Sequence, residues 1–393
     1  MALTANSIVP ELFPGHDGLM SHGLVYKNQH IFEGSMLGKT PSGFIKTFEA
    51  GDEWVGWAKH EYYNSSATDG EPSVAGNVAT ILGKEHITFL RGGIVAVPLT
   101  GLTQADRGKP VFALSDNSYS LIGHPDAFIG YIWEIERGST TKAWVRVREG
   151  GEQVRQTDGV HFWRLTGDET IPNVITASNE TAVHGFRLDA IGAGITAGAG
   201  WKNVVNVAGG EIVGTLDNDN EAQNLTIETP LLMAQTYGMT IRCKGRLSVL
   251  GPTATTDFTL GLMTAATSTM TDAIRANTEV TTSGIGKAAI HNDGDSVNLL
   301  FTVDDNATVV GPTDTTLDNS LTVNKDTVII IRPSGVVELW VDGVRIFGTT
   351  TLTVGASITT LWGGIVNLEK STGTDVSAVN IQLLEVKGAS LPA

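Results

Sequence analysis

The sequence predicts an all-β protein of two domains, and three observations support this fold class. The chain has 393 residues, long enough for two or three domains that each bury a hydrophobic core. Hydrophobic residues make up 41% of the chain and charged residues only 17%, which is unlike the composition of disordered proteins. The 46 glycines, together with frequent Thr and Val, indicate many short strands joined by tight turns.

Residues 1–45 are predicted to form an extended arm. Proline or glycine interrupts this segment every few residues, and only short apolar pieces remain between the interruptions. Such a segment cannot form a core of its own, so we expect it to be flexible or to lie along another surface. Its apolar side chains would anchor it to a neighbouring chain, and the expected anchors are Leu12, Phe13, Leu24, Tyr26, Ile31 and Phe32.

Residues 46–165 are predicted to form a small β-domain. Apolar runs such as 86–90 and 94–97, or 111–114 and 119–122, follow each other closely with turn-forming residues between them. Short strands at such regular spacing are typical of a β-sandwich or a β-barrel. One helical turn is expected at 103–107, because Thr103 can cap its start, Asp106 follows three residues later and Gly108 can end it.

A polar, turn-rich linker at 166–182 is predicted to separate this domain from a second one at 183–393. The clearest piece of the second domain is 327–347, where Asp342-Gly343 separates the apolar runs 336–341 and 344–347. Asp-Gly between apolar runs is a strong hairpin signal, because a type I′ turn needs positive φ at both central residues. With further strand-like runs on either side, this domain is expected to be a two-sheet sandwich.

The charge of the chain argues against two classes of partner. The formal net charge is −16 and no block of Lys or Arg occurs, so neither nucleic acid nor an anionic membrane is expected to bind. No stretch approaches the ~18 apolar residues of a membrane-spanning helix, and residues 1–10 lack the features of a secretory signal. Cys243 is the only cysteine, and its apolar-alternating surroundings predict that it is buried.

Catalytic patterns give no positive signal. The chain shows no nucleophile elbow, and neither a P-loop nor a dinucleotide-binding pattern occurs in a strand-to-helix context. We therefore expect no enzyme activity and no organic cofactor. His16, Asp17, His22 and His30 lie close together in the sequence but match no established zinc pattern, so they are interpreted as solvated or interface residues.

Two further groups of residues could bind a ligand. Asn292, Asp293 and Asp295 form an oxygen-rich turn of the kind that can ligate Ca²⁺. Trp340 shares one face of the run 336–341 with Glu338, and there it could stack on a sugar ring or cap the sheet against a loop or a neighbouring subunit.

The stretch 48–147 resembles the small capsid decoration proteins of bacteriophages. The resemblance is carried, in this order, by AGDEWVGWA (50–58), RGGIVAVPLTGLTQADRGKPVFALSDNSYSLIG (91–123) and AFIGYIWEIERGSTTKAWVRV (127–147). It implies a β-barrel-like domain that docks on the outer surface of a capsid. The implied partners are the major capsid protein and further copies of this chain, with a homotrimer expected first and a dimer as the alternative.

The run VIIIRPSGVVELWVDGVRI (328–346) resembles the core of concanavalin-like and laminin-G-like jelly rolls. This resemblance implies that residues 183–393 form a jelly-roll β-sandwich. Because laminin-G-like domains often hold Ca²⁺ at the rim of a sheet, it also implies that role for Asn292, Asp293 and Asp295.

These features together predict a structural virion protein that is made in the host cytoplasm and placed on the outer surface of a capsid. There it would decorate and cement the lattice through its arm and its first domain. The competing prediction is a phage fibre or adhesin whose C-terminal sandwich binds host-surface carbohydrate, with Trp340 as a contact. Neither function requires catalysis.

Overall fold

The computed structural model divides the chain into two compact units. Unit 1 contains Met1–Val160 and Gly388–Ala393, and unit 2 contains His161–Lys387. Apart from three short 3₁₀ turns, the regular structure of the described residues is β-strand, which confirms the all-β class. The described residues are 7, 9–13, 18–64, 69, 86–148, 154, 159–169, 171, 181–191, 200–204, 210–216, 223–249, 256–264, 286–293, 297–305, 309–318, 323–348, 350–355, 360–370, 372–374 and 376–391.

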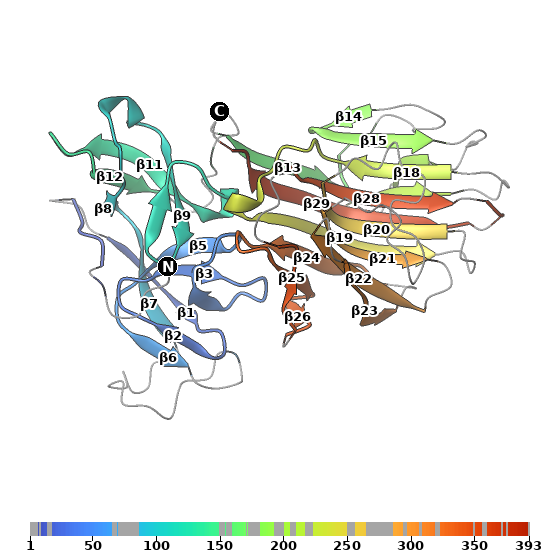
Figure 1. Ribbon diagram of the computed structural model, residues 1–393, viewed down its shortest axis with the longest axis horizontal. Coiled ribbons are helices and arrows are strands. Elements are labelled where there is room, and N and C mark those ends of the chain that lie inside the picture. The colour runs from blue at the N-terminus through green and yellow to red at the C-terminus, as the bar shows by residue number, and fades with distance from the viewer. Residues whose placement is uncertain are drawn as a thin grey trace. The chain divides into compact units, whose positions relative to one another are not determined.

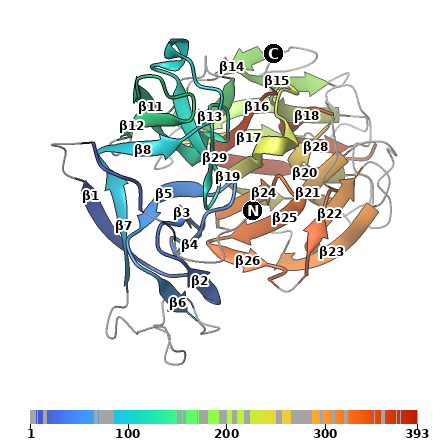
Figure 2. The same ribbon diagram turned by 60° about the vertical axis from the view of Figure 1, so that its left-hand side comes forward.

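Unit 1 contains two five-stranded antiparallel sheets (Figure 2). Sheet 1 has the order β1 (Leu19–Leu24), β7 (His86–Gly92), β5 (Glu53–Ala58), β3 (Met36–Lys39) and β4 (Ile45–Thr47). Sheet 2 has the order β10 (Ser118–Ser120), β9 (Pro110–Ser115), β11 (Phe128–Ile135), β12 (Lys142–Val147) and β8 (Ile94–Pro98). A two-stranded ribbon of β2 (Gln29–Ile31) and β6 (Tyr62–Asn64) completes the unit.

Aromatic side chains join the two sheets of unit 1. Trp54 and Trp57 on β5 are both buried, and their rings meet edge to face with centroids 4.9 Å apart. Trp57 Nε1 donates a hydrogen bond of 2.9 Å to the hydroxyl of Tyr119, which lies on β10 in the other sheet. Burial raises the pKa of Tyr119 to about 12, so its hydroxyl stays protonated and the link persists at any moderate pH.

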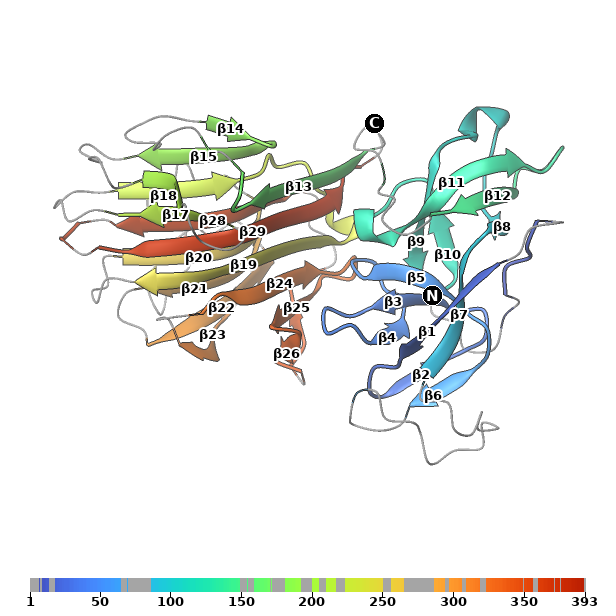
Figure 3. The same ribbon diagram turned by 180° about the vertical axis from the view of Figure 1, so that it is seen from behind.

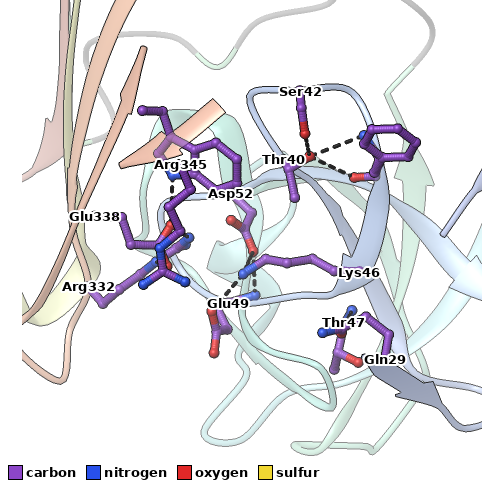
Figure 4. A network of polar contacts seen from close by, with 12 residues as sticks. Gln29, Thr40, Ser42, Lys46, Thr47, Glu49, Asp52, Arg332, Glu338 and Arg345 are labelled. Atoms are coloured by element: carbon purple, nitrogen blue, oxygen red, sulfur yellow. Dashed lines mark hydrogen bonds and ion pairs between the residues drawn. The ribbon is translucent and has the colours of Figure 1, made fainter. Parts of the chain in front are cut away.

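An ion-pair network fixes the connection from β4 to β5 (Figure 4). Lys46 Nζ lies 2.7 Å from Glu49 Oε2 and 3.2 Å from Asp52 Oδ2. The backbone N–H of Glu49 also donates to Asp52 Oδ2 at 2.9 Å. One buried lysine therefore holds both ends of the turn.

The expected arm at residues 1–45 is wrong, because much of this segment lies within the sheets of unit 1. Leu12 forms a β-bridge with Val95, and the ring of Phe13 packs edge to face on Trp144 with centroids 5.0 Å apart. Strands β1, β2 and β3 all come from this segment, and Ile31 is fully buried in the core. The frequent glycines and prolines keep each strand short, but β1 pairs with β7 and β2 pairs with β6, both distant in the sequence.

The short strands expected in residues 46–165 are present, and β9–β10 and β11–β12 pair as hairpins. Strands β7 and β8 follow each other directly, yet they lie in different sheets, because Gly93 turns the chain at a φ of 108°.

The helical turn expected at 103–107 is confirmed as a 3₁₀ turn over Gln104–Asp106. Asp106 Oδ2 accepts hydrogen bonds from the backbone N–H of Thr103 at 2.7 Å and from its hydroxyl at 2.9 Å. The ion pair with Lys109 and the bonds from Thr103 lower the pKa of Asp106 to about 2. Asp106 therefore stays ionised and caps the turn down to strongly acidic pH.

Unit 2 is a sandwich of two antiparallel sheets (Figure 1). Sheet 3 has nine strands, of which seven follow the order β16 (Gly200–Val204), β17 (Glu211–Thr215), β29 (Ala378–Ala389), β19 (Met239–Val249), β24 (Lys325–Ile331), β25 (Val336–Val341) and β26 (Val344–Ile346). The other two are β13 (Val160–Thr166), which pairs with β29, and β27 (Leu352–Thr353), which pairs with β25. Figure 3 shows β13, β29, β19 and β24 running side by side in this sheet.

Sheet 4 has eight strands. Their order is β14 (Thr181–Val183), β15 (Phe186–Ile191), β18 (Gln223–Glu228), β28 (Gly363–Lys370), β20 (Thr256–Met263), β21 (Gly286–Asp293), β22 (Asn298–Asp305) and β23 (Val309–Asp318). Apolar side chains from both sheets form one core between them, to which Ile227, Leu260 and Phe301 contribute from sheet 4 and Ile241, Ile329 and Val386 from sheet 3.

The expected linker at 166–182 is also wrong in its described part. The boundary between the units lies at Val160 and His161, six residues before the expected linker begins. The backbone N–H of Gly167 donates to the carbonyl of Gln382 at 2.8 Å, and Ile171 is buried in the core of unit 2. The polar composition of this segment reflects turns at the edge of a sheet, which in a sequence look the same as an interdomain linker.

The hairpin at 336–346 forms as the sequence predicts. Strands β25 and β26 are joined by Asp342 and Gly343, whose φ angles are 49° and 76°. Both angles are positive, as a type I′ turn requires.

Candidate functional site

The outer face of sheet 4 carries a band of polar side chains, all of them buried except the partly exposed Arg187. Successive residues of a strand face opposite sides of a sheet, so Leu225 and Ile227 on β18 face the core while Asn224, Thr226 and Glu228 face outward. The same alternation holds on the neighbouring strands. We call this set the polar band, and its members are Arg187, Asp189, Asn224, Thr226, Glu228, Asp257, Thr259, Lys287, His291, Thr302, Asp304, Asn367 and Glu369.

Strand register aligns these residues in rows across the sheet. One row pairs Thr226 with Asn367, Asn367 with Thr259, and Thr259 with His291. A second row pairs Asn224 with Glu369 and Glu369 with Asp257. Side chains directly opposite each other on antiparallel strands have Cβ atoms about 4.5–5.5 Å apart, so each row is a continuous line of polar groups.

Hydrogen bonds between the rows fix the orientation of Glu369. Asn367 Nδ2 donates to Asn224 Oδ1 at 2.8 Å, and the hydroxyl of Thr226 donates to the same oxygen at 2.8 Å. Asn224 Nδ2 is thereby turned toward Glu369 and donates to its Oε2 at 3.2 Å. Three side chains from β18 and β28 thus hold one carboxylate in place.

Lys287 lies toward one end of β21 and is fully buried. Its Nζ lies 3.8 Å from Asp304 Oδ2, which is longer than a hydrogen bond. Burial lowers the pKa of Lys287, although the charge of Asp304 acts in the opposite direction.

His291 lies on the same face of β21 as Lys287. Its Nε2 is 2.8 Å from the hydroxyl of Thr302 on β22. Burial, with a smaller effect from the charge of Lys287, lowers the pKa of His291 to about 4. The imidazole is therefore neutral at physiological pH and presents one donor and one acceptor.

Asp257 and Glu369 are two acidic residues paired by register. They lie directly opposite each other on β20 and β28 and are 4% and 5% exposed. Carboxylates on neighbouring strands can accept several hydroxyl donors at once. Retaining glycosidases also use two carboxylates, with the groups about 5–5.5 Å apart.

Trp340 lies in a different cluster from the polar band. As predicted, it shares the outer face of β25 with Glu338, while Val337, Leu339 and Val341 face the core. Trp340 Nε1 donates to Glu338 Oε2 at 2.9 Å. Arg332 Nη2 donates to the same oxygen at 3.0 Å, and Figure 4 shows Arg332 beside Glu338.

The ring of Trp340 is only 3% exposed, so it offers no open face on which a sugar could stack. Most residues of the polar band are as buried as Trp340, and we take the band as the candidate site because it offers a row of hydrogen-bonding groups rather than a single ring.

The expected calcium turn is only partly described. Asn292 is buried, and its Nδ2 donates to the carbonyl of Asn298 at 2.6 Å, which closes the connection between β21 and β22. The backbone of Asp293 ends β21, and Asp295 lies outside the described residues. In the described part of the chain, no three His, Cys, Asp or Glu side chains are arranged to hold a metal ion.

The anchors expected in the arm have separate positions in unit 1. Ile31 belongs to one core cluster of unit 1 and Leu12 packs against another. The backbone N–H of Tyr26 donates to the carbonyl of Ile45 at 2.7 Å. Phe13 contacts Trp144, and Phe32 packs against the ring of His30 with centroids 4.2 Å apart. Of the six anchors, Leu24 is the one that remains exposed, at 36%.

The polar band is not recognisable in the sequence pattern. Its residues come from segments such as 224–228, 257–259 and 367–369, which are far apart in the sequence. Within each strand, polar and apolar residues alternate, and this is also the pattern of an ordinary solvated sheet face. Only the burial of the polar side chains distinguishes the two cases, and burial is not visible in the sequence.

No helix among the described residues has the length and apolar character needed to span a membrane. Searches against protein-family models and against characterised proteins found no match.

Solved structures with a similar arrangement include an endo-1,3-β-glucanase from Streptomyces sioyaensis, with 12% identity over 59% of this chain and 98% of that chain and a TM-score of 0.36. They also include a cellulose-induced protein, Cip1, with 11% identity over 52% of this chain and 93% of that chain and a TM-score of 0.33. A third is the carbohydrate recognition domain of Emp46p, with 12% identity, coverage of 49% and 89%, and a TM-score of 0.30.

At TM-scores below 0.5, these similarities carry no argument about function. The architecture follows from the strands themselves, and the second unit is a jelly-roll β-sandwich.

Proposed function

We propose that the second unit binds a neutral carbohydrate on the polar band of sheet 4. The observation that supports this proposal is the burial of the band, where Thr226, Asn367, Thr259 and His291 form a line of polar groups that are each no more than 3% exposed. Amide, hydroxyl, imidazole and carboxylate groups in fixed positions are the donors and acceptors that match the hydroxyls of a sugar.

The cost of this arrangement favours a functional role over a structural one. Burying polar or ionised groups destabilises a fold unless they are hydrogen-bonded or paired, and an apolar outer surface covered by other residues would cost less. Proteins retain such costly groups mainly at functional sites. The ordered chain from Asn367 through Asn224 to Glu369 also shows preorganisation, which lowers the entropic cost of binding a ligand.

The charge of the band indicates which sugars would bind. The band contains more carboxylates than cationic side chains, so its formal charge is negative. The five carboxylates are Asp189, Glu228, Asp257, Asp304 and Glu369, and the two cationic side chains are Arg187 and Lys287. Like charges repel in a site screened from water. Neutral saccharides should therefore bind in preference to uronic acids or sulfated sugars.

The test compares two threonine-to-valine substitutions in the full chain. Thr259→Val removes a hydroxyl from the centre of the polar band, and Thr240→Val removes a buried hydroxyl from the outer face of sheet 3. Binding to a panel of neutral and acidic oligosaccharides would be measured by calorimetry. We expect Thr259→Val to weaken binding of the preferred neutral sugar by roughly 2- to 12-fold, the value of one ordinary hydrogen bond.

Thr240→Val should leave binding unchanged. Equal losses from both variants, or no binding of any neutral sugar, would contradict the proposal. Reducing ends released from the bound oligosaccharide would instead show that the protein cleaves it, which contradicts a role in binding alone.

We also propose that the first unit attaches to the outer surface of a bacteriophage capsid. This second candidate rests on the resemblance of residues 48–147 to decoration proteins and on one surface feature. Trp133 is the extra residue of a β-bulge, because Ile132 pairs with Val145 and Glu134 pairs with Trp144. The bulge leaves Trp133 52% exposed. Exposed tryptophans that become buried in a complex are frequent hot spots of binding.

Trp133→Ala should therefore reduce co-sedimentation with undecorated phage heads. A hot spot contributes about 2 kcal/mol or more, which corresponds to roughly a 30-fold change in Kd. The control is Val344→Ala on β26 of the second unit, because Val344 is also an exposed apolar residue, at 64%. Unchanged binding of Trp133→Ala to heads would rule out this contact.

A further inference from the structure

Lys287 and Asp304 lie directly opposite each other on β21 and β22, at one end of the polar band. Both side chains are buried, and Lys287 Nζ makes no hydrogen bond among the described residues. The nearby carboxylate favours the ammonium form, which carries three N–H donors. Leaving the donors of a buried cation without acceptors destabilises a fold, so this group indicates a place where a ligand supplies the acceptor.

The distance between the two groups matches one bridging hydroxyl. Lys287 Nζ and Asp304 Oδ2 are 3.8 Å apart, which is too long for a direct hydrogen bond. An oxygen atom about 2.8 Å from each of them can bridge this distance, accepting from Nζ and donating to the carboxylate. A hydroxyl can do both, whereas an ionised carboxylate can only accept. The pair therefore matches a sugar hydroxyl better than an acidic group.

A row of small residues separates this pair from the next polar row. Ala289 lies between Lys287 and His291 on the outer face of β21, and Gly261 lies opposite Ala289 on β20. A Cβ atom added to Gly261 would lie 2.5 Å from the Cβ of Ala289, so a larger residue at Gly261 would displace its neighbour. On β20 and β21, this row therefore contributes neither a bulky side chain nor a hydrogen-bonding one.

The spacing of the two polar rows indicates the size of the ligand. Lys287 and His291 are four positions apart on β21, which corresponds to about 13 Å at ~3.3 Å per residue. Lys287 reaches sideways to Asp304 on the neighbouring strand, so its length does not shorten this separation. A single sugar ring is shorter than the span between the rows, so contact with both rows requires more than one ring.

We propose that the ligand of the polar band is an oligosaccharide that lies along β20 and β21. One ring lies at the row of His291, and a hydroxyl of a further ring bridges Lys287 and Asp304. The linkage between the rings lies over Gly261 and Ala289, where neither side chain obstructs it. This inference rests on the proposed function and adds to it the length and the direction of the ligand.

The test measures how affinity depends on the length of the sugar. Neutral gluco-, manno- and galacto-oligosaccharides, each from the monosaccharide to the tetrasaccharide, would be titrated into the full-length protein by calorimetry. Affinity should rise by roughly 12- to 160-fold at the length that first reaches Lys287, because this is the value of one hydrogen bond to a charged group.

The decisive variant combines Lys287→Met with Asp304→Leu. It removes both charges at once, and replacing a buried pair by apolar residues of similar volume often leaves stability unchanged. All lengths should bind this variant with one affinity, because the groups that distinguish them are gone. Thr259→Val should instead weaken every length by the same factor and keep the dependence on length.

The matched control combines Arg242→Met with Asp326→Leu, which removes an ion pair from sheet 3. It should keep both the affinities and the length dependence of the unchanged protein, and circular dichroism would confirm that all variants are folded. Equal affinity for all lengths in the unchanged protein would overturn the inference and leave the proposed function intact. The same holds if the variant of Lys287 and Asp304 keeps the length dependence, or loses binding at every length. Absence of binding by any neutral sugar would contradict the proposed function itself.

Discussion

At the scale of single residues, Glu211 is a buried carboxylate of the second unit that accepts hydrogen bonds from three side chains. It lies at the start of β17 and is 1% exposed. Arg246 donates to its two oxygens at 2.7 and 3.0 Å, and Asn380 donates to it at 2.8 Å. Burial alone would raise the pKa of Glu211, but hydrogen bonds from Arg246, Asn380 and Asn324 outweigh it and hold the pKa below its ordinary value of 4.5.

We predict that Arg246→Met strongly destabilises the second unit at neutral pH. The substitution leaves the Glu211 carboxylate buried without its cation, and breaking a buried pair costs about 3–5 kcal/mol. The lower end of that range applies here, because the side chain of Arg246 is 25% exposed. The free energy of unfolding from urea titrations would measure the loss.

Arg242→Met is the matched control for this prediction. Arg242 lies on the same strand, β19, and also binds a carboxylate through two nitrogens, at 2.8 and 2.6 Å from Asp326. The side chains of Arg242 and Asp326 are 44% and 31% exposed, so this pair should contribute only about 0–1 kcal/mol. Equal losses in the free energy of unfolding from the two substitutions would show that burial of Glu211 does not increase the cost of removing its cation.

The ion pair between Glu211 and Arg246 should make the stability of the second unit depend on pH. Because the pKa of Glu211 is lower in the folded than in the unfolded protein, its stabilisation is complete above pH 4.5 and is lost as the pH falls through the folded value. The difference in stability between the unchanged protein and Arg246→Met should therefore shrink below pH 4.5.

At the scale of secondary-structure elements, the first three strands decide whether unit 1 folds. Val25, Ile31, Met36 and Leu37 all have no exposed surface, and all four precede β4. Sheet 1 takes β1 and β3 from this segment, and β2 pairs with β6. A segment that contributes both core residues and strands is part of the domain.

Deleting residues 1–43 should therefore unfold unit 1 and leave unit 2 folded. Each buried apolar side chain contributes about 1.5–3 kcal/mol, and the four together approach the stability of a whole domain, about 5–15 kcal/mol. Calorimetry should show the loss of one thermal transition and the persistence of the other. A truncated protein that keeps both transitions would contradict this prediction and support the extended arm that the sequence predicts.

At the scale of the whole molecule, the two candidate functions belong to different units. The polar band lies entirely within unit 2, whereas Trp133 lies in unit 1. Unit 1 also contains residues from both ends of the chain, since Gly388–Ala393 belong to it and Ser390 donates to the carbonyl of Gly159 at 3.0 Å. Substitutions in one unit should thus leave the function of the other intact.

The sequence determined the features that depend on neighbouring residues. It predicted the all-β class, the hairpin at Asp342-Gly343 and the capped turn at Thr103, because glycine frequency, turn geometry and capping act over a few positions. It also predicted the burial of Cys243, which is 6% exposed and whose thiol has a pKa raised to about 12, chiefly by burial. Each of these follows from local preference or from apolar alternation within one strand.

The tertiary structure alone decided which strands pair and which polar residues meet. β1 pairs with β7 across more than sixty positions of sequence, so nothing within residues 1–45 indicates that this segment belongs to a sheet. Likewise, Thr226, Asn367 and Thr259 lie side by side only because β28 pairs with both β18 and β20. Strand pairing depends on which distant side chains become buried together. The residues of a single strand do not indicate which other strand provides that burial.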